Sequence, residues 1–326
     1  MKIRLAILLI LLITNQEKSI AQVANAQSTS KFRVTGYLRE TTIDDGEALK
    51  FDFSRINYLN IAFITPDKDG NFPAFNGLNV VVSAAHKKNV KVLASLGGGL
   101  APVWYSTLLS DSLRNGFIKK IVQLVSDHQL DGIDVDLEGE RIDSNYESFV
   151  TGLSTALKQH GKLLTAAVAT VYKTRYTDAA LSQLDFINIM SYDKTGPWRP
   201  ANPGQHSPYA MAVEDLDYWT NTRSIAKEKL SLGLPFYGYG FGANAPQDMG
   251  YKRIVSQYAG SEKTDSVTFT GGGVLYYNGI PTIKAKTQLA LQKAGGVMIW
   301  QLMGDADGGN SLLNVINATI RSAGKE

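Results

Sequence analysis

The sequence has no cysteine among its 326 residues and only four histidines. Without cysteine the chain forms no disulfide and carries no lipid-modified cysteine that would tether it to a membrane. The histidines, His86, His128, His160 and His206, lie far apart, and none belongs to a His-Glu-x-x-His motif, so nothing favours a zinc site. We interpret all four as ordinary surface or helix residues.

Other common signatures are missing as well. The sequence contains no Gly-x-Ser-x-Gly elbow and no phosphate loop ending in Gly-Lys-Ser or Gly-Lys-Thr. The formal net charge is +3, which gives no electrostatic reason to expect nucleic acid or an anionic membrane as a partner. The run Gly97-Gly98-Gly99 has no lysine after it, so we interpret it as a place where the backbone comes close to another group.

Residues 1–21 have the pattern of a secretory signal peptide. Lys2 and Arg4 precede an apolar run over residues 5–13, and small residues at positions 19 and 21 form a cleavage pattern. A second pattern of this kind places the cleavage after residue 26. The apolar run is too short to span a bilayer, and no later stretch approaches the roughly 20 residues that a membrane helix needs. We therefore expect a secreted or periplasmic protein with no membrane association after cleavage, and a mature chain of residues 22–326.

From residue 32 onward, short apolar runs alternate with helical patterns. Helices are predicted over Leu78 to Lys88, Ser112 to His128, Tyr146 to His160 and Val213 to Lys229. Strands are predicted over Phe32 to Leu38, Tyr58 to Ile64, Val90 to Leu96, Gly132 to Glu138, Leu163 to Thr170, Phe186 to Tyr192, Leu230 to Phe236 and Gly296 to Leu302. This alternation predicts an α/β fold, a closed (β/α)8 TIM barrel whose C-terminal strand ends form the active face.

The fourth predicted strand is acidic on one face. Asp134, Asp136 and Glu138 alternate with aliphatic residues, so in a strand they share one side and lie roughly 6.5 to 7 Å apart. Carboxyl groups this close in a poorly solvated place do not all ionise easily, and at least one should have a raised pKa, as a general acid requires. A cation site built from carboxylate oxygens and a solvated edge strand are the two alternatives.

This strand and four other segments resemble the motifs of one enzyme family. The stretch from Asp131 to Glu138 resembles the signature of the family 18 glycoside hydrolases, which include chitinases and endo-β-N-acetylglucosaminidases. The other motifs follow in the family's order, as Ser95-Leu96-Gly97-Gly98, Met190-Ser191-Tyr192-Asp193, Leu232-Gly233-Leu234-Pro235-Phe236-Tyr237-Gly238 and Gly295-Gly296-Val297-Met298-Ile299-Trp300. Together they span most of the expected mature chain, so we identify it as a member of this family.

The resemblance implies a retaining glycosidase that needs no metal and no cofactor. In this family the 2-acetamido oxygen of the substrate attacks the anomeric carbon, in place of a carboxylate of the enzyme. Glu138 would protonate the leaving oxygen and later activate water, and Asp136 would hold the acetamido group and stabilise the positive intermediate. Asp134 would share a proton with Asp136, and the Tyr192 hydroxyl would bind the acetamido oxygen. Asp131, at the start of the strand, is expected to be structural.

The resemblance also suggests residues that bind the sugar. Trp300 would form the apolar floor under the reacting sugar, with a buried core tryptophan as the alternative. Asp193 and Met190 would line the same subsite, although plain filling of the barrel explains Met190 equally well. Aromatic residues at or beyond predicted strand ends are further candidates for the cleft: Tyr37, Phe63, Trp198 and Tyr237.

The segment between the seventh and eighth strands bears on the substrate. Residues 242–283 form a short insertion in which we predict one small hairpin, from Val267 to Tyr277. A reduced groove wall fits chitooligosaccharides, a glycoprotein glycan or a peptidoglycan-like chain better than crystalline chitin. We expect a monomer that hydrolyses β-1,4 links of N-acetylglucosamine-containing glycans. An endo-β-N-acetylglucosaminidase, a glycan-binding barrel without turnover and a divalent-metal enzyme are the alternatives.

Overall fold

The computed structural model describes residues 31–325 of the chain. The compact unit that carries the fold begins at Arg33. The predicted signal peptide, residues 1–21, and the alternative cleavage point after residue 26 lie outside the described residues, so export stays a prediction. Within residues 31–325, no helix combines the length and the apolar character that crossing a membrane requires.

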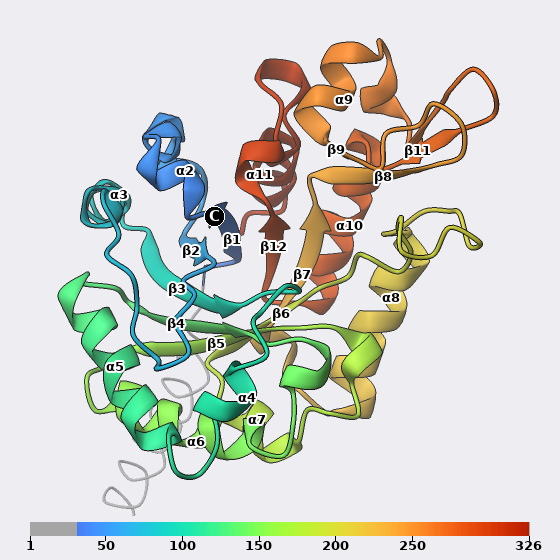
Figure 1. Ribbon diagram of the computed structural model, residues 1–326. Helices are drawn as coiled ribbons and strands as arrows, with labels where there is room; N and C mark the ends of the chain where they lie inside the picture. Colours follow the sequence, from blue (N-terminus) through green and yellow to red (C-terminus); the bar gives the residue numbers. More distant parts are fainter. Residues whose placement is uncertain (1–30, 326) are drawn as a thin grey trace, which may run out of the picture. The chain divides into compact units, whose positions relative to one another are not determined.

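The barrel strands form a closed parallel sheet (Figure 1). Their order around the barrel is β1, β12, β7, β6, β5, β4, β3 and β2. The strands are β1 Arg33–Arg39, β2 Tyr58–Ala62, β3 Lys91–Gly97, β4 Gly132–Asp136, β5 Leu163–Val168, β6 Phe186–Ile189, β7 Leu230–Pro235 and β12 Gly296–Trp300. They are buried on both faces, which is why they read as apolar runs in the sequence. The predicted (β/α)8 barrel is confirmed.

Several strands end earlier than predicted. β4 ends at Asp136, because its pairing with β3 stops where Gly97 faces Asp136. Glu138 therefore lies in the loop just after the strand, two residues beyond its end. β6 likewise ends at Ile189, so Tyr192 belongs to the following loop.

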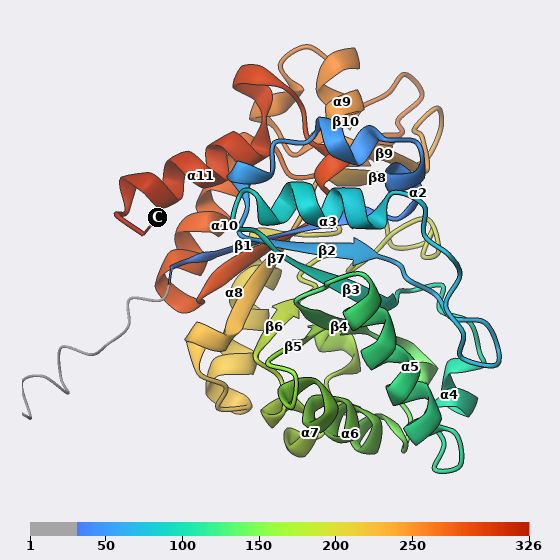
Figure 2. The ribbon, with the colours of Figure 1, turned by 90° about the vertical axis from the view of Figure 1, so that its left-hand side faces the viewer.

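Helices cover the outside of the barrel (Figure 2). The α-helices are α2 Thr41–Asp44, α3 Leu78–His86, α4 Tyr105–Leu108, α5 Arg114–Asp127, α6 Tyr146–Lys158, α7 Asp178–Ser182, α8 Tyr209–Asp217, α9 Tyr251–Gln257, α10 Ile280–Lys293 and α11 Leu312–Ser322. Short 3-10 turns occupy Glu47–Lys50, Phe53–Arg55, Gly139–Arg141, Thr170–Tyr172, Lys227–Lys229, Ser261–Lys263, Leu302–Gly304 and Gly308–Asn310.

The helix predicted over Val213 to Lys229 is wrong in its second half. α8 ends at Asp217 and continues as a single π-helical turn, Tyr218–Thr222. Ser224 then adopts a left-handed backbone conformation with φ of 53°, which ends the helical path. Trp219 is fully buried in this turn and donates from Nε1 to Oγ1 of Thr170 at 3.0 Å. These long-range contacts override the helical pattern of the sequence.

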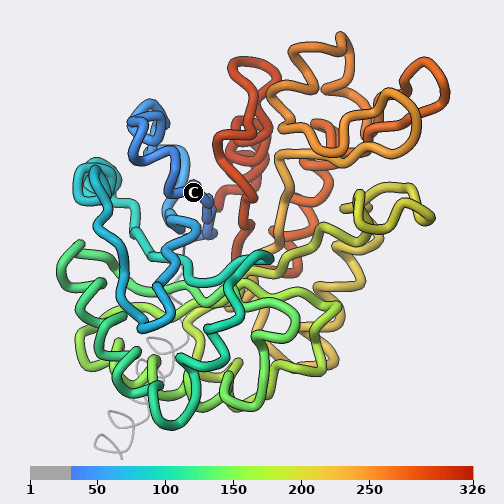
Figure 3. The backbone as a smooth tube through the Cα atoms, in the orientation of Figure 1, coloured from blue at the N-terminus to red at the C-terminus, as the bar shows by residue number. Residues whose placement is uncertain are grey.

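The insertion is larger than one hairpin. Four antiparallel strands in the order β10, β11, β8, β9 form a second sheet, and helix α9 accompanies it. The strands are β8 Tyr237–Phe241, β9 Asp248–Gly250, β10 Ser266–Thr268 and β11 Val274–Tyr276. The hairpin of β10 and β11 is confirmed, but β8 and β9 were missed and the insertion begins soon after β7 instead of at residue 242. In Figure 3 the insertion, drawn in orange, lies beside the yellow loop that follows β6.

Candidate active site

Glu138 follows the C-terminal end of β4, the end of the barrel at which enzymes of this fold place catalytic groups. Burial raises the pKa of its carboxyl to about 7, the charge of Asp193 adds to the rise, and Arg141 opposes it. A carboxyl with a pKa near 7 holds a proton on part of the molecules at neutral pH. It is therefore able to act as an acid and, once ionised, as a base.

Asp136 lies on the same face, inside the barrel and 3% exposed. Burial raises its pKa well above the usual value, and the charges of Glu138 and Asp134 add to the rise. Its Oδ1 is buried and has no hydrogen-bond partner within the described part of the chain. Such an atom is costly unless a ligand, a proton or a water satisfies it, so Asp136 is ready to bond a group that enters from the strand ends.

Asp134 is fully buried below Asp136 and is held by four side-chain donors. They are the Tyr37 hydroxyl at 2.7 Å, the Ser95 hydroxyl at 2.8 Å, the Thr165 hydroxyl at 2.6 Å and the Asn188 amide at 3.3 Å. Burial raises the pKa of Asp134, and these hydrogen bonds oppose that rise. The four donors fix the carboxyl rigidly at the base of the acidic row.

The glycine run brings β3 close to this row. Gly97 has φ of 120°, and a Cβ on it would lie 2.2 Å from the carbonyl oxygen of Asp136. The amide of Gly98 donates to that same oxygen at 2.6 Å, and a Cβ on Gly99 would lie 3.3 Å from Oε1 of Glu138. The interpretation of this run as a point of close backbone approach is confirmed.

Aromatic and sulfur-containing side chains surround the acids. Trp300 is partly exposed, stacks on Phe63 with ring centroids 5.4 Å apart, and meets Tyr37 edge-on at 5.6 Å. Five of the predicted sugar-binding residues share this cluster: Trp300, Met190, Tyr37, Phe63 and Tyr237. A partly exposed tryptophan presents a flat apolar face of the kind on which the C-H face of a sugar can stack.

Tyr192 lies in the same cluster, 8% exposed. Its hydroxyl donates to the sulfur of Met298 at 3.6 Å, which is a weak hydrogen bond. Burial raises the pKa of this hydroxyl well above its usual value, so it keeps its proton. A stronger acceptor in the cluster would readily replace the sulfur.

Asp193 sits beside this cluster in a left-handed backbone conformation with φ of 60°. The Tyr237 hydroxyl donates to its Oδ1 at 2.5 Å, and Nδ1 of His206 lies 3.3 Å from the same atom. His206 is fully buried, so its interpretation as a surface or helix residue was wrong. It lies in the loop after β6. Because His206 is 13 residues from Asp193 in the chain, no local sequence pattern indicated this contact.

Trp198 stands apart from the other candidates. It is 54% exposed and packs edge-on against Tyr239 with ring centroids 5.1 Å apart. Through Tyr239 it joins the rings of Tyr237 and His206 at the edge of the insertion.

Sequence reasoning missed some residues of the site. Thr165, Asn188 and Met298 were not singled out, although Thr165 and Asn188 are polar residues at inward positions of buried strands. Asp131 was expected to be structural, and it accepts hydrogen bonds from the amide of Val92 and, at 2.8 Å, from Nε2 of His86.

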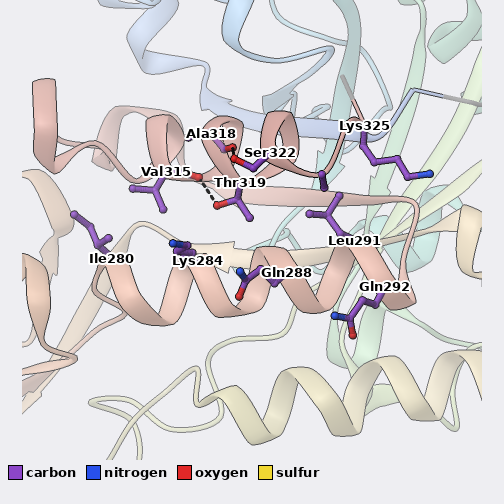
Figure 4. Close-up of a pocket in the computed structure, with 11 residues that line it drawn as sticks. Ile280, Lys284, Gln288, Leu291, Gln292, Val315, Ala318, Thr319, Ser322 and Lys325 are labelled. Carbon is purple, nitrogen blue, oxygen red and sulfur yellow. Dashed lines mark hydrogen bonds between the residues drawn. The ribbon is translucent and has the colours of Figure 1, made fainter.

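Two further features of the described residues bear on other kinds of site. Among residues 31–325, no group of three or more His, Cys, Asp or Glu side chains is arranged to hold a metal ion. Figure 4 shows a groove between α10 and α11, lined by residues such as Lys284, Gln288 and Thr319. Its lining contains no carboxyl group, so it provides no acid for hydrolysis.

The comparison with protein families decides the identity of the fold. The model of the glycosyl hydrolases family 18 matches residues 33–305, from the first barrel strand to beyond the last. The chain belongs to this family. The predicted membership is thereby confirmed, together with the barrel that the family shares.

Solved structures of family 18 chitinases are similar over nearly the whole barrel. The chitinase ChiB from the chitin utilization locus of Flavobacterium johnsoniae is 36% identical, with a TM-score of 0.83 over 90% of this chain and 95% of that one. A chitinase from Bacteroides thetaiotaomicron is 28% identical, with a TM-score of 0.76 over 91% of this chain and 99% of that one. The fold is therefore that of a family 18 chitinase.

Curated relatives of the chain are matched over part of their length. A chitinase-like effector of Moniliophthora perniciosa is 27% identical over 68% of this chain, which spans 58% of that protein. Probable chitinase 2 of Drosophila melanogaster is 31% identical over 47% of this chain and 35% of that protein. The relatives thus include proteins named as chitinases and proteins named as chitinase-like effectors, so activity has to be argued from the site.

Proposed function

We propose that this protein is a retaining glycosidase that hydrolyses β-1,4 links of N-acetylglucosamine-containing glycans, chitin or chitooligosaccharides, by substrate assistance. One observation carries the proposal above the others. Glu138, whose pKa is raised to about 7, stands at the mouth of the barrel above two buried carboxyls, Asp136 and Asp134. A family member that only binds glycans has no need of a proton held at this position.

The proposed first step uses Glu138 as the acid. Its proton passes to the glycosidic oxygen as the bond to the anomeric carbon breaks, and the 2-acetamido oxygen of the same sugar attacks that carbon. The resulting oxazolinium ion is positive, and Asp136 lies beside Glu138 with an oxygen free to accept the acetamido N–H. The ionised Glu138 then takes a proton from water while the water oxygen attacks the anomeric carbon. The bond from that carbon to the acetamido oxygen breaks, so the acetamido group is restored and the configuration is retained.

Asp134 and Tyr192 support this step in different ways. Asp134 is locked by its four donors, so its role is to share a proton with Asp136 and to hold the acidic row in place. The Tyr192 hydroxyl, which donates to the sulfur of Met298 in a weak hydrogen bond, would turn to the acetamido oxygen. Trp300 would carry the sugar ring, with Asp193 and Tyr237 at its edge.

The activity should fall as the pH rises through about 7. Glu138 must be protonated in the free enzyme to act as the acid, and its pKa is raised to about 7 by burial and by Asp193. Above that pH the carboxyl is ionised, so kcat/KM should drop about tenfold per pH unit. A pH profile of kcat/KM on a chitooligosaccharide measures this fall at alkaline pH. A profile that stays flat up to pH 9 would contradict the assignment of Glu138 as the acid.

Two substrates distinguish the chitinase from its nearest alternative. The purified protein is incubated with a chitooligosaccharide and, separately, with a high-mannose glycoprotein, and the products are sized by mass spectrometry. We expect shorter N-acetylglucosamine oligomers from the first substrate and no glycan release from the second. Release from the glycoprotein alone would identify an endo-β-N-acetylglucosaminidase, and no cleavage of either, with binding of the oligosaccharide, would favour a glycan-binding barrel.

A further inference from the structure

Two hydrogen bonds connect the loop after β3 to the segment that carries Glu138. The amide of Gly98 donates to the carbonyl oxygen of Asp136, the last residue of β4, at 2.6 Å. Three residues further along each chain segment, Nη2 of Arg141 donates to the carbonyl oxygen of Ala101, at 2.5 Å. In the chain, Glu138 thus stands between the two residues that make these connections.

The carboxyl of Glu138 lies against the backbone of the connected loop. A Cβ on Gly99 would lie 3.3 Å from Oε1 of Glu138, so the glycine backbone borders the space that this carboxyl occupies. Glu138 is half-buried and Gly99 is exposed, which leaves this side of the carboxyl open at the mouth of the barrel. A shift of the loop would therefore change the position of the carboxyl.

Each of the two segments is also closed by a hydrogen bond of its own. The amide of Ala101 donates to the carbonyl oxygen of Gly98 at 2.9 Å. The amide of Arg141 donates to the carbonyl oxygen of Glu138 at 3.2 Å. Together with the bonds to Asp136 and from Arg141 to Ala101, they form a closed circuit, and the guanidinium of Arg141 completes it.

The local sequence places Arg141 so that it completes this circuit. Gly139 has φ of 58°, which turns the chain directly after Glu138 and begins the 3-10 turn Gly139–Arg141. A guanidinium keeps its charge at every working pH, and a hydrogen bond from a charged donor is stronger than one from a neutral donor. The acceptor, Ala101, is 1% exposed, so water competes little for its carbonyl oxygen.

We propose that Arg141 is a positioning residue of the hydrolysis, whose hydrogen bond to Ala101 fixes the β3 loop against Glu138 and so holds the acid in line with the leaving oxygen. The inference rests on the proposed glycosidase function. A general acid has to lie within about 2.6 to 3.2 Å of the atom that it protonates. A misplacement of about 1 Å can cost about 10²-fold in rate, so a loop that is no longer tied should slow the reaction.

The substitution Arg141→Met tests the proposal with two leaving groups. Methionine keeps much of the length of the side chain and removes its donors. On a chitooligosaccharide, whose leaving sugar needs the proton of Glu138, kcat/KM should fall about tenfold or more. On a dinitrophenyl glycoside of the same oligosaccharide, whose phenolate leaves without a proton, it should fall less than about threefold. The parameter kcat/KM reports the steps up to bond cleavage, so the later attack of water does not enter.

Arg175 provides the matched control. Its Nη2 donates to Oε1 of Glu140 at 2.5 Å, in the same 3-10 turn. Arg175→Met removes the same charge near this turn and leaves the bond between Arg141 and Ala101 intact. We expect both substrates to be cleaved within about twofold of the wild-type rate, because an exposed ion pair contributes little.

Two other roles of Arg141 predict different results. A purely structural role lowers kcat/KM equally on both substrates, and equal losses would overturn the proposal. Arg141 also opposes the rise in the pKa of Glu138, so loss of its charge alone would move the fall in activity to higher pH. That effect disappears at about pH 5, where Glu138 is protonated. A loss on the oligosaccharide that is absent at that pH would overturn the proposal as well.

Hydrogen exchange tests the connection without turnover. In Arg141→Met the amide of Ala101 should exchange about fivefold faster or more, and in Arg175→Met it should not. If the wild-type protein cleaves no N-acetylglucosamine oligomer, the proposed function is wrong, and faster exchange still supports the connection between the loops. Unchanged exchange overturns it in either case. If Arg141→Met does not fold, Arg141→Gln takes its place, because it leaves a polar group near the buried position of Nε.

Discussion

Replacing Glu138 with glutamine should lower kcat on a chitooligosaccharide by about 10³-fold or more, while the affinity for the oligosaccharide stays close to that of the wild type. Glutamine has nearly the same shape but supplies no proton to the leaving oxygen. The carboxyl acts in the transition state, so its loss affects the chemical step and not the binding of the ground state. Single-turnover hydrolysis measures the rate, and calorimetric titration of the oligosaccharide measures the affinity.

The neighbouring Glu140 is the matched control for this change. It is exposed, ion-pairs with Arg175 at 2.5 Å, and lies two residues along the same loop. Glu140→Gln removes the same charge from the loop, and we expect nearly wild-type turnover because an exposed pair of this kind contributes little. Wild-type turnover by Glu138→Gln would refute the assignment of the acid, and loss of binding would mean that Glu138 mainly supports the structure.

Replacing the 2-acetamido group of the reacting sugar with a hydroxyl should abolish cleavage. The proposed reaction takes its nucleophile from the substrate, and a hydroxyl cannot form the five-membered oxazolinium ring. Asp136 lies two residues before Glu138 at the end of β4, but it is buried and its pKa is raised well above the usual value. An enclosed carboxyl with a raised pKa is a poor nucleophile, so no group of the protein is expected to compensate.

A pair of otherwise identical oligosaccharides tests this expectation. Both should stack on Trp300, so competition between them separates loss of binding from loss of reaction. For the acetamido substrate, proton NMR at early times should show the β-anomer as the first product, because attack from within the sugar and then by water retains the configuration. Efficient hydrolysis of the hydroxyl analogue would exclude substrate assistance and point to Asp136 as the nucleophile.

The acidic row shows how much of the site a local sequence pattern can predict. The alternation of Asp134, Asp136 and Glu138 with aliphatic residues indicated one shared face, and the structure buries Asp134 and Asp136 on that face. The pattern also indicated that at least one pKa would be raised, and burial raises the pKa of all three carboxyls. It failed at the end of the strand, because only the pairing with β3 determines that β4 stops at Asp136.

Short elements and long-range contacts escaped prediction for a related reason. The strands β9, β10 and β11 have three residues each, too few to show alternation. β8 contains Gly238 and Gly240, where a Cβ would lie 2.3 Å from the carbonyl oxygen of Tyr276 and 2.1 Å from that of Pro246, respectively. Their packing against the rest of the insertion, and not their propensity, makes them a sheet.

The sequence by itself determined the barrel, the family and the row of acids, because each depends on residues close together in the chain with a fixed period of side-chain direction. Only the tertiary structure decided which groups surround those acids. Thr165 and Asn188 reach Asp134 from other strands, and His206 reaches Asp193 across a loop of the chain. The closure of the barrel brings such residues together, and the burial that results, which no local pattern contains, raises the pKa of Glu138 to about 7.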